Sequence, residues 1–390
     1  MRPGPTQHLL EQISPERLAK LTYDLVSIKS YTGDTVEAAG FYAEHLARLG
    51  LAVETVTDYP NSPVVIGRLH GGVGPTLTLN GHIDTVPVDH PPVEMKDGTI
   101  YGRGAADMKS ALAAMAEVAR VLRENHIHLG GTLQLIAHGL HEAPGGHGED
   151  LTAVVRRGLG GDAAIVTEVG VDDLPVVGMG MTIFEISVTR EGDPGHELMT
   201  PAGTPHPLLA AGQVLVSLQE MNAKLQQEPV ARIGPESVFV GMVAGGDFYN
   251  RFPSSCRIVG TRRYGPQRHL EDVRAELTAL LDRVAAETGC QLNLRLQPVR
   301  DSFQVAEDSA IVRALQAAYH ELHGRELPFS GIRIVADAPV FIREGGVPCI
   351  YHGIRGHGAH ADLEYVDVDD IVRATREYLL TVLNYLGNGA

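Results

Sequence analysis

Histidine and acidic residues gather directly after apolar segments of this sequence. The first such stretch, Gly81-His82-Ile83-Asp84-Thr85-Val86-Pro87, follows an apolar segment at 76–80. The carboxyl ends of strands are where open α/β sheets bind their ligands, and a carboxylate two residues later can accept the second imidazole N–H and fix the tautomer. His82 is therefore a possible metal ligand and Asp84 its orienting carboxylate. For a lone His-x-Asp, a polar turn after a strand would be the better interpretation.

Asp107 lies just before an Ala-rich run that predicts a helix over 109–125. The glycines of the surrounding stretch 102–110 allow a close backbone approach, but the Gly-Lys-Ser/Thr ending of a phosphate loop is missing. One interpretation is a helix N-cap, a position that aspartate favours. The other is a carboxylate that bridges two cations with its two oxygens, and the residues alone leave both open.

The loop at 138–148 contains three histidines and a glutamate: His138, His141, Glu142 and His147. It follows directly on a strand predicted at 132–137. This concentration of ligand-type side chains in a Gly-rich loop is hard to explain structurally. We therefore favour a functional role for the loop.

Glu168 and His360 complete the set of possible metal ligands. Glu168 ends an apolar strand predicted at 163–167, where an unpaired charge is rare. His360 lies in a late histidine cluster, in which His357 is better interpreted as a surface residue. A donor set of His, Asp and Glu without Cys suits zinc, cobalt or manganese. Two such metals sharing one carboxylate would lie about 3.5–4 Å apart and clamp an attacking hydroxide.

The elements that must position these residues alternate between strand and helix. Helices are predicted within 15–49 and at 109–125, 309–322 and 369–386, and strands at 52–57, 64–69, 76–80, 99–101, 132–137, 163–167 and 349–351. Such alternation predicts an α/β sheet covered on both faces.

A different pattern occupies residues 178–298. Strands at 182–190, 236–243, 256–262 and 291–298, with helices at 207–225 and 270–288, give the β-α-β-β-α-β order of a ferredoxin-like unit. We therefore predict a discontinuous first domain, 1–177 and 299–390, interrupted by an inserted α+β domain of plausible size.

The composition argues against several other classes of protein. The formal net charge of -16 over 390 residues disfavours nucleic acid and anionic membranes as partners. The three cysteines, Cys256, Cys290 and Cys349, are scattered and include no Cys-x-x-Cys, which argues against a disulfide framework or a thiolate zinc site. No apolar signal core follows the first residues and no apolar run is long enough to span a bilayer, so we expect a cytoplasmic protein.

The order and spacing of these stretches resemble the acetylornithine deacetylase, succinyl-diaminopimelate desuccinylase and aminoacylase family of dinuclear zinc hydrolases. Gly-His-Ile-Asp-Thr-Val-Pro and Gly-Arg-Gly-Ala-Ala-Asp-Met-Lys are the most specific marks, and the likeness covers nearly the whole chain. It implies a zinc-hydrolase (phosphorylase/hydrolase-like) catalytic domain with a mixed sheet, and an inserted ferredoxin-like domain that pairs two chains into a homodimer. It also implies two bound metal ions, with His82 and Glu168 on one, Asp107 bridging, His360 on the other and Asp84 orienting His82.

The resemblance extends into the insertion. Gly195-His196 looks like the family's Gly-His, which reaches across the dimer to the substrate's carbonyl oxygen. Gly245-Gly246-Asp247-Phe248-Tyr249-Asn250 is similar to a Gly-rich stretch that ends in a substrate-facing Asn250. Arg263 resembles the arginine that binds a substrate carboxylate, with Arg262 as a one-residue alternative. For His196, a loop histidine in a Gly/Pro turn is an equal alternative.

One stretch departs from the family pattern, which has Asp-Glu-Glu where this chain has Leu140-His141-Glu142-Ala143. Counting from the strand makes His141 the general base and Glu142 a ligand of the second metal. Counting back from Gly145-Gly146 makes Glu142 the base and leaves Ala143 at the ligand position, unless His141 or His147 replaces it. We favour the first count, because a strand end fixes side-chain direction while a Gly-rich loop tolerates an inserted residue.

The resulting hypothesis is a zinc-dependent amidohydrolase that cleaves an N-acyl amino acid or a small peptide. Its metals would polarise the scissile carbonyl and lower the pKa of a bridging water to roughly 7. Two alternatives stay open. One is a non-catalytic protein of the same fold that binds metal or a small molecule, and the other is an N-carbamoyl amino acid amidohydrolase.

Overall fold

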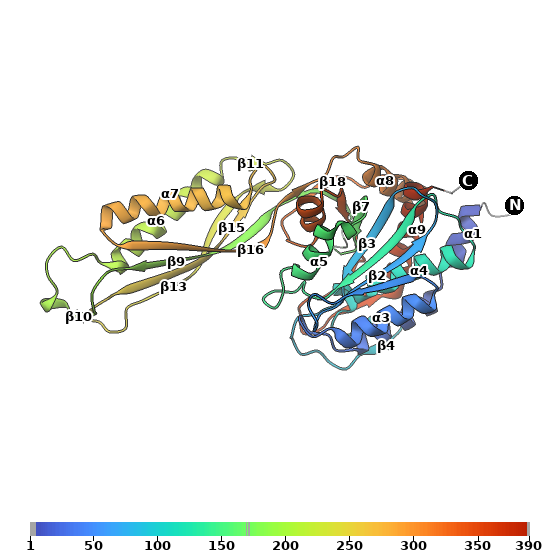
Figure 1. Ribbon diagram of the computed structural model, residues 1–390, viewed down its shortest axis with the longest axis horizontal. Helices are drawn as coiled ribbons and strands as arrows, with labels where there is room; N and C mark the ends of the chain where they lie inside the picture. Colours follow the sequence, from blue (N-terminus) through green and yellow to red (C-terminus); the bar gives the residue numbers. More distant parts are fainter. Residues whose placement is uncertain (1–4, 169, 171, 388–390) are drawn as a thin grey trace. The chain divides into compact units, whose positions relative to one another are not determined.

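The chain forms two compact units in the computed structural model, which describes residues 5–168, 170 and 172–387 (Figure 1). The first unit contains the described residues up to Val176, Val305–Ser330 and those from Ala336 onward. The second contains Val177–Gln304 and Gly331–Val335. It therefore extends beyond the predicted end at 298, because its last strand continues to Arg300, and it takes in a segment from much later in the chain.

A six-stranded mixed sheet forms the centre of the first unit, in the order β1-β2-β6-β3-β7-β19. Four neighbouring strands run parallel to one another: β6 (Thr132–His138), β3 (Thr76–His82), β7 (Ala163–Val166) and β19 (Cys349–Tyr351). At one edge, β2 (Val64–His70) pairs antiparallel with β6, and β1 (Ala52–Val56) pairs antiparallel with β2. The parallel strands are buried along nearly their whole length. Burial on both faces is what helical layers on either side of a parallel sheet produce.

The sheet register determines where the polar strand ends meet. His82 is paired with His138 in the parallel β3–β6 ladder, and Asn80 is paired with Val166 of β7. The carboxyl ends of three neighbouring strands therefore meet at one edge. Glu168, two residues beyond the end of β7, lies at the same edge.

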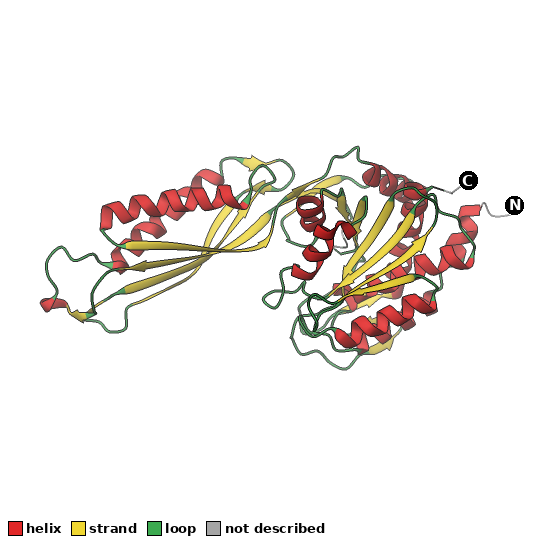
Figure 2. Ribbon diagram, in the orientation of Figure 1, coloured by secondary structure: helices red, strands yellow, loops and turns green. Residues whose placement is uncertain are grey.

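Amphipathic helices cover this sheet, as Figure 2 shows. Helix α3 (Val36–Arg48) packs on β1 and β2, whereas α4 (Ser110–Glu124) and α9 (Val368–Leu386) pack on β3 and β6. Leu112, Met115 and Tyr378 are among the fully buried side chains of this core. No helix among the described residues is both long enough and apolar enough to cross a membrane.

The remaining elements of the chain are mostly short, and sequence analysis missed several of them. They are α1 (Pro5–Glu11), α2 (Pro15–Ser27), β4 (Glu94–Lys96), β5 (Thr99–Tyr101), α5 (Glu149–Val154), β8 (Leu174–Gly178), β10 (Gly195–His196), β11 (Pro229–Val230), β12 (Gly234–Pro235), β14 (Arg251–Phe252), β17 (Phe303–Gln304), α8 (Ala310–His323), β18 (Phe329–Ile332) and β20 (Tyr365–Asp367). Of these, α2, α8 and β5 had been predicted. Two or three residues carry no readable periodicity, so the shortest strands have no signature in the sequence.

The second unit is a four-stranded antiparallel sheet with two helices. Its elements follow in the order β9 (Gly180–Thr189), α6 (Pro207–Leu225), β13 (Ser237–Gly245), β15 (Ser255–Tyr264), α7 (Leu270–Thr288) and β16 (Gln291–Arg300). The strand order β13-β15-β9-β16 is that of a ferredoxin-like unit. Alternate residues Phe184, Ile186 and Val188 of β9 share one core with both helices, so both helices lie on the same face of the sheet.

Candidate metal centre

His82 ends β3 with a fully buried side chain. Its Nδ1 lies 3.0 Å from the backbone oxygen of Asp84 and 3.4 Å from the Asp84 Oδ1 atom. The backbone carbonyl of Asp84 is thus the nearer acceptor for the Nδ1–H group of His82. The side-chain Oδ2 of Asp84 accepts hydrogen bonds from the backbone N–H groups of His141 (3.1 Å) and Glu142 (3.0 Å). Asp84 therefore positions both the imidazole and the loop that follows β6.

The Asp107 carboxylate lies between two imidazoles. Its Oδ1 is 3.0 Å from Nε2 of His82, and its Oδ2 is 3.3 Å from Nε2 of His360. Helix α4 begins only at Ser110, after a distorted turn in which Asp107 has non-helical dihedral angles (φ -129°, ψ 90°). The N-cap interpretation of Asp107 is therefore wrong, and the geometry is that of a carboxylate able to bridge two cations.

Glu142 and His360 lie on the far side of Asp107. The Glu142 Oε1 is 2.9 Å from Nε2 of His360, although the two residues are far apart in the sequence. Possible ligand atoms of His82, Asp107 and Glu142 all lie within 4.8 Å of one another. Glu142 thus lies beside Asp107 and His360, where the count from the strand expects a ligand of the second metal. Ala143, the ligand position in the other count, has no side-chain donor atom.

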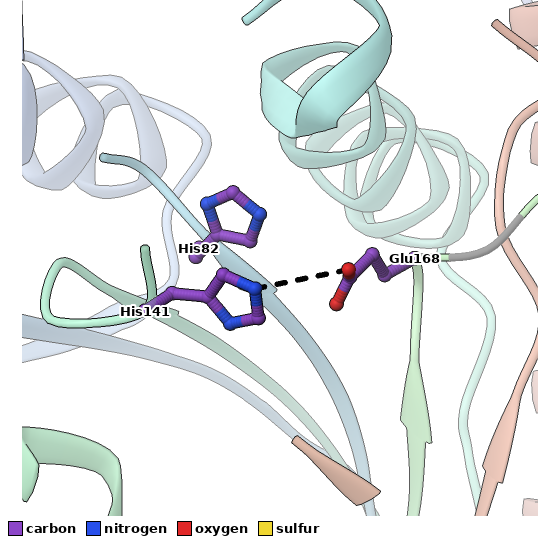
Figure 3. A group of neighbouring side chains, drawn as sticks. All are labelled: His82, His141 and Glu168. Atoms are coloured by element: carbon purple, nitrogen blue, oxygen red, sulfur yellow. Dashed lines mark ion pairs between the residues drawn. The ribbon is translucent and has the colours of Figure 1, made fainter. Parts of the chain in front are cut away.

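His141 faces the opposite side, toward His82 and Glu168 (Figure 3). Its ring stacks on that of His82 with the centroids 4.0 Å apart and the planes inclined by 4°. The Nε2 atom of His141 lies 3.7 Å from Glu168 Oε1, and its Nδ1 lies 2.7 Å from Oδ2 of Asp337. The other oxygen of Glu168 is buried without a hydrogen-bond partner among the described residues, which is costly unless a cation compensates.

The acidic surroundings favour protonated imidazoles at this centre. Burial opposes a charge on His82, but hydrogen bonds to Asp107 and Asp84 outweigh it and raise its pKa well above the usual value. Burial likewise opposes a charge on His141, yet the negative charge of Asp337 and its hydrogen bond raise the pKa of this imidazole to about 9.

The pKa values of His360 and of the nearby carboxylates are also shifted by burial and by their mutual contacts. Hydrogen bonds to Asp107 and Glu142 raise the pKa of His360 to about 10. Burial opposes ionisation of Asp107 and Asp84, but hydrogen bonds from the imidazoles lower the pKa of Asp107 strongly and that of Asp84 to about 2. Burial raises the pKa of Glu168 to about 7, with the nearby Asp107 charge adding to it.

This pattern fits a divalent cation. The negative potential that holds protons on the imidazoles would equally stabilise metal ions, which displace those protons when the nitrogens become ligands. The described donors form three groups that could hold a metal ion: His82 with Asp107 and Glu142, His82 with His141 and Glu168, and His138 with His141 and Asp337. His360 adds a nitrogen within 3.3 Å of Asp107.

Glu364 is a residue of this centre that the sequence analysis did not single out. Its buried Oε1 accepts backbone N–H groups from Gly104 (3.0 Å), Ala106 (2.9 Å) and Asp107 (2.9 Å), and its Oε2 accepts a hydrogen bond from Arg103 (2.7 Å). It thereby fixes the turn that presents Asp107. The sequence shows that Glu364 lies four residues after His360, but no sequence pattern indicates that its carboxylate binds backbone N–H groups.

Asp337 and Asp150 were also missed. Asp337 contacts His141 and His138, and Asp150 accepts the backbone N–H groups of Gly139 (2.8 Å) and Leu140 (3.1 Å). Both are buried aspartates from segments without periodicity, so no pattern distinguished them from surface residues.

The predicted substrate-binding residues all belong to the second unit. The Asn250 Nδ2 is 3.3 Å from Nε2 of His196, so these two residues are neighbours. Arg263 is half-buried and donates to the backbone oxygen of Arg333 (2.8 Å). Arg262, the one-residue alternative, is fully buried in ion pairs with Glu236 (2.7 Å) and Glu276 (3.0 Å), which excludes it as a residue that binds substrate. 

Comparison with known proteins identifies the family behind this arrangement. A family model described as peptidase family M20/M25/M40 matches residues 78–384. The chain belongs to this family. Over 414 residues this M20 chain is 23% identical to the N-formyl-4-amino-5-aminomethyl-2-methylpyrimidine deformylase of Bacillus subtilis (strain 168), with 95% of each chain covered. It is 27% identical over 386 residues to the succinyl-diaminopimelate desuccinylase of Methylobacterium radiotolerans, covering 94% of this chain and 96% of that one.

Solved structures of M20 proteins have the same fold. Aminopeptidase PepT from Bacillus cereus ATCC 10987 superimposes with a TM-score of 0.81 at 20% identity, covering 96% of this chain and 99% of that one. The Bacillus subtilis YXEP protein, described as a dinuclear metal binding peptidase, gives a TM-score of 0.73 at 19% identity over 96% and 99% of the two chains. The M20 protein is thus a hydrolase whose relatives act on amide bonds, and family and donor groups together support divalent metal ions at its centre.

Proposed function

We propose that this M20 protein is a two-zinc amidohydrolase that cleaves N-acyl amino acids or small peptides. The observation that carries the proposal is the Asp107 carboxylate, each of whose oxygens faces a different imidazole. A shared carboxylate between two histidines is the arrangement that a two-metal site requires. A donor set without cysteine suits zinc, with cobalt and manganese as the alternatives.

Each metal would have three protein ligands. His82, Asp107 and Glu168 would hold the first, and Asp107, Glu142 and His360 the second. When bound, the pair supplies Lewis-acid chemistry that polarises the scissile carbonyl and acidifies a water molecule. Asp84 keeps the Nδ1 of His82 protonated through its backbone carbonyl, which leaves Nε2 for the metal side.

His141 is our proposed general base in the metal-loaded site, where the positive charge of two cations would lower its pKa from about 9 and leave the imidazole neutral. Glu142 is directed to His360, at 2.9 Å, whereas the Nε2 of His141 faces Glu168 and its Nδ1 is engaged by Asp337. Nε2 would take a proton from the attacking water as the water oxygen bonds to the carbonyl carbon. The same proton would then pass to the amine nitrogen as the C–N bond breaks, which completes the hydrolysis.

Arg263 supports a substrate that carries a carboxylate. Its guanidinium contacts the backbone of Arg333 and forms no ion pair with a carboxylate among the described residues, in contrast to Arg262. A half-buried guanidinium without a carboxylate partner favours binding of an anionic ligand. Succinyl-diaminopimelate, which the name of the desuccinylase relative gives as its substrate, carries carboxylates of this kind, whereas the aminopyrimidine in the name of the deformylase relative carries none.

A homodimer is the proposed assembly. β13 is an edge strand of its sheet, and Phe239, Met242 and Val243 on it are large, apolar and exposed. Uncovered apolar edge strands pair readily with a second chain, and two-fold contacts are the commonest way to join identical chains.

The test is a substrate panel with the zinc-loaded protein. N-acetyl, N-succinyl, N-formyl and N-carbamoyl amino acids, dipeptides and an N-formyl aminopyrimidine would be compared by kcat/KM, before and after chelation. We expect chelator-sensitive hydrolysis of an acyl amino acid or dipeptide, about two zinc ions per chain, and loss of both metals in Asp107→Ala. Ammonia release from the carbamoyl substrates alone would replace this function with a carbamoyl hydrolase. Full metal content without any turnover would favour the binding-protein alternative.

A further inference from the structure

We propose that Asp337 is a positioning residue that holds His141 in the tautomer and orientation needed for proton transfer. This inference rests on the proposed function, because it assigns a partner to the proposed base. The contact is short and buried: Nδ1 of His141 lies 2.7 Å from Oδ2 of Asp337, and the aspartate is 1% exposed. Nothing in the order of the sequence connects the two residues, which are 196 positions apart.

The Asp337 carboxylate determines which nitrogen of His141 carries a proton. A carboxylate oxygen only accepts hydrogen bonds, so the Nδ1 of His141 must donate to it. The lone pair of the neutral ring then lies on Nε2, the nitrogen that faces Glu168 at 3.7 Å. A buried aspartate that fixes the tautomer of a catalytic imidazole performs the same task in hydrolases with a Ser-His-Asp triad.

A second imidazole lies beside Asp337. Nε2 of His138, at the end of β6, lies 3.0 Å from the same Oδ2 atom, although it forms no hydrogen bond among the described residues. The Nδ1 of this ring lies 3.1 Å from the carbonyl of Gly81 and 3.2 Å from the side-chain nitrogen of Asn80, so the ring is anchored to β3. The His138 ring therefore lies between Asp337 and the central sheet, and a protonated His138 would form an ion pair with Asp337.

Stacking fixes the plane of the His141 ring, and Asp337 fixes its rotation. The ring lies 4.0 Å from His82 with nearly parallel planes, which leaves flipping about the Cβ–Cγ bond as the remaining freedom. A flip would exchange Nδ1 with Cδ2 and Nε2 with Cε1, and would therefore direct a carbon, rather than Nδ1, at Asp337. The hydrogen bond to Asp337 disfavours that state.

A double-mutant cycle tests the inference. Kinetics and metal content would be measured for Asp337→Ala, His141→Ala and the double variant. We expect Asp337→Ala to lower kcat by about 10²-fold or more, with little change in KM and both metals retained. In the His141→Ala background the same change should have almost no further effect, because the two residues act as one unit. Asp337→Asn should also lower kcat strongly, because its amide can present an N–H to Nδ1 and the charge that selects the Nδ1–H tautomer is lost.

Asp150→Asn is the matched control. It alters another buried aspartate that supports the same loop. The hydrogen bonds of Asp150 to other described residues come from the backbone N–H groups of Gly139, Leu140 and Leu151. Its effect should be the same in both backgrounds. An equal loss from Asp337→Ala with and without His141 would overturn the inference, as would loss of a metal in either single variant, which would make His141 a ligand.

A spectroscopic measurement separates this inference from the proposed function. Imidazole ¹⁵N chemical shifts of the zinc-loaded protein report the protonated nitrogen of His141 without any substrate. We expect the Nδ1–H form in the parent protein, and loss of this single form in Asp337→Asn and Asp337→Ala. An Nε2–H form in the parent protein would overturn the role of Asp337, even if hydrolysis is observed. An Nδ1–H form without turnover of any substrate would instead contradict the proposed function.

Discussion

Adjacent residues at the end of β6 are directed to different sides of the centre. His141 stacks on His82 and faces Glu168, while Glu142 contacts His360. The backbone N–H groups of both donate to one oxygen of Asp84, which fixes this divergence. Two neighbouring side chains can therefore serve different parts of one reaction.

Substitutions at these two positions should give different losses. His141→Ala should lower kcat by about 10²–10⁴-fold while both metals stay bound, because it removes a proton acceptor and no ligand. Glu142→Ala should lose one metal together with activity. Metal analysis and steady-state kinetics on the same preparations check the pair. Retention of both metals in an inactive Glu142→Ala protein would show that Glu142 is the base.

Three of the residues that sequence analysis placed at this centre share one property, which Asp107 and His360 lack. His82, Glu142 and Glu168 follow apolar strands, and the end of a strand predicts both location and direction. Asp337 and Glu364 come from irregular segments, where no periodicity indicates what they contact. Asp107 shows the intermediate case: its place before a helix was evident, but the distorted turn that excludes capping was not.

At the scale of elements, the turn before α4 depends on a segment near the other end of the chain. Glu364 binds three backbone N–H groups of residues 104–107 and also Arg103. Burial raises the pKa of Glu364, while the backbone hydrogen bonds act in the opposite direction. The bridging carboxylate is thus positioned by backbone contacts rather than by side-chain packing.

Loss of this support should weaken metal binding. Glu364→Ala should reduce zinc affinity by about 10–100-fold, the usual effect of removing a group that orients a ligand. Competition with a chelating dye measures the change. Arg103→Lys is a suitable comparison, because it keeps a cation beside Glu364 and leaves the backbone contacts in place. Equal zinc affinities in the Glu364→Ala and parent proteins would refute the role of Glu364 in positioning Asp107.

A second buried carboxylate joins three elements away from the metal centre. Glu377 of α9 contacts His323 of α8 (2.8 Å) and His352 after β19 (2.6 Å), and Arg373 lies 3.1 Å away. Burial opposes its charge, but the hydrogen bond and charge of His352, with Arg373, lower the pKa of Glu377 to about 2. The ionised form is therefore favoured in the folded state.

Stability should respond to acid through Glu377. Because its pKa is lower in the folded than in the unfolded chain, its contribution is fully present above pH 4.5 and is lost as pH falls toward 2. Glu377→Gln should lower the free energy of unfolding near pH 7 by up to about 3 kcal/mol. Urea titrations from pH 7 to 3 should show the parent and the variant converging; a constant difference would contradict the assignment.

At the scale of the whole molecule, the two units follow different folding rules. The first is a mixed sheet with helices on its faces, and the second is an antiparallel sheet with both helices on one face. Hydrophobic periodicity predicted both patterns, because long amphipathic segments dominate them. The later segment Gly331–Val335 escaped prediction, because only contacts such as that between Arg263 and Arg333 assign it to the second unit.

The proposed homodimer makes a prediction of its own. If His196 completes the centre of the second chain, a His196→Ala chain mixed with an Asp107→Ala chain should regain part of the lost activity. One centre in such a heterodimer contains intact groups from both chains. Activity assays on mixtures, with heterodimers verified by differential tags, provide the measurement. Verified heterodimers without recovery would place His196 in its own chain's reaction or outside it.

The contact between Glu142 and His360 has a consequence for how the protein is made. His82, Asp107, Glu142 and Glu168 are all synthesised before the second unit, whereas His360 is synthesised after it. At about 5–20 residues per second, the ribosome needs on the order of ten seconds or more to add the intervening chain. If the proposed ligand assignment holds, the ligands of the first metal exist well before those of the second are complete. A nascent chain could then acquire one ion early, but the shared centre would close only when translation is nearly finished.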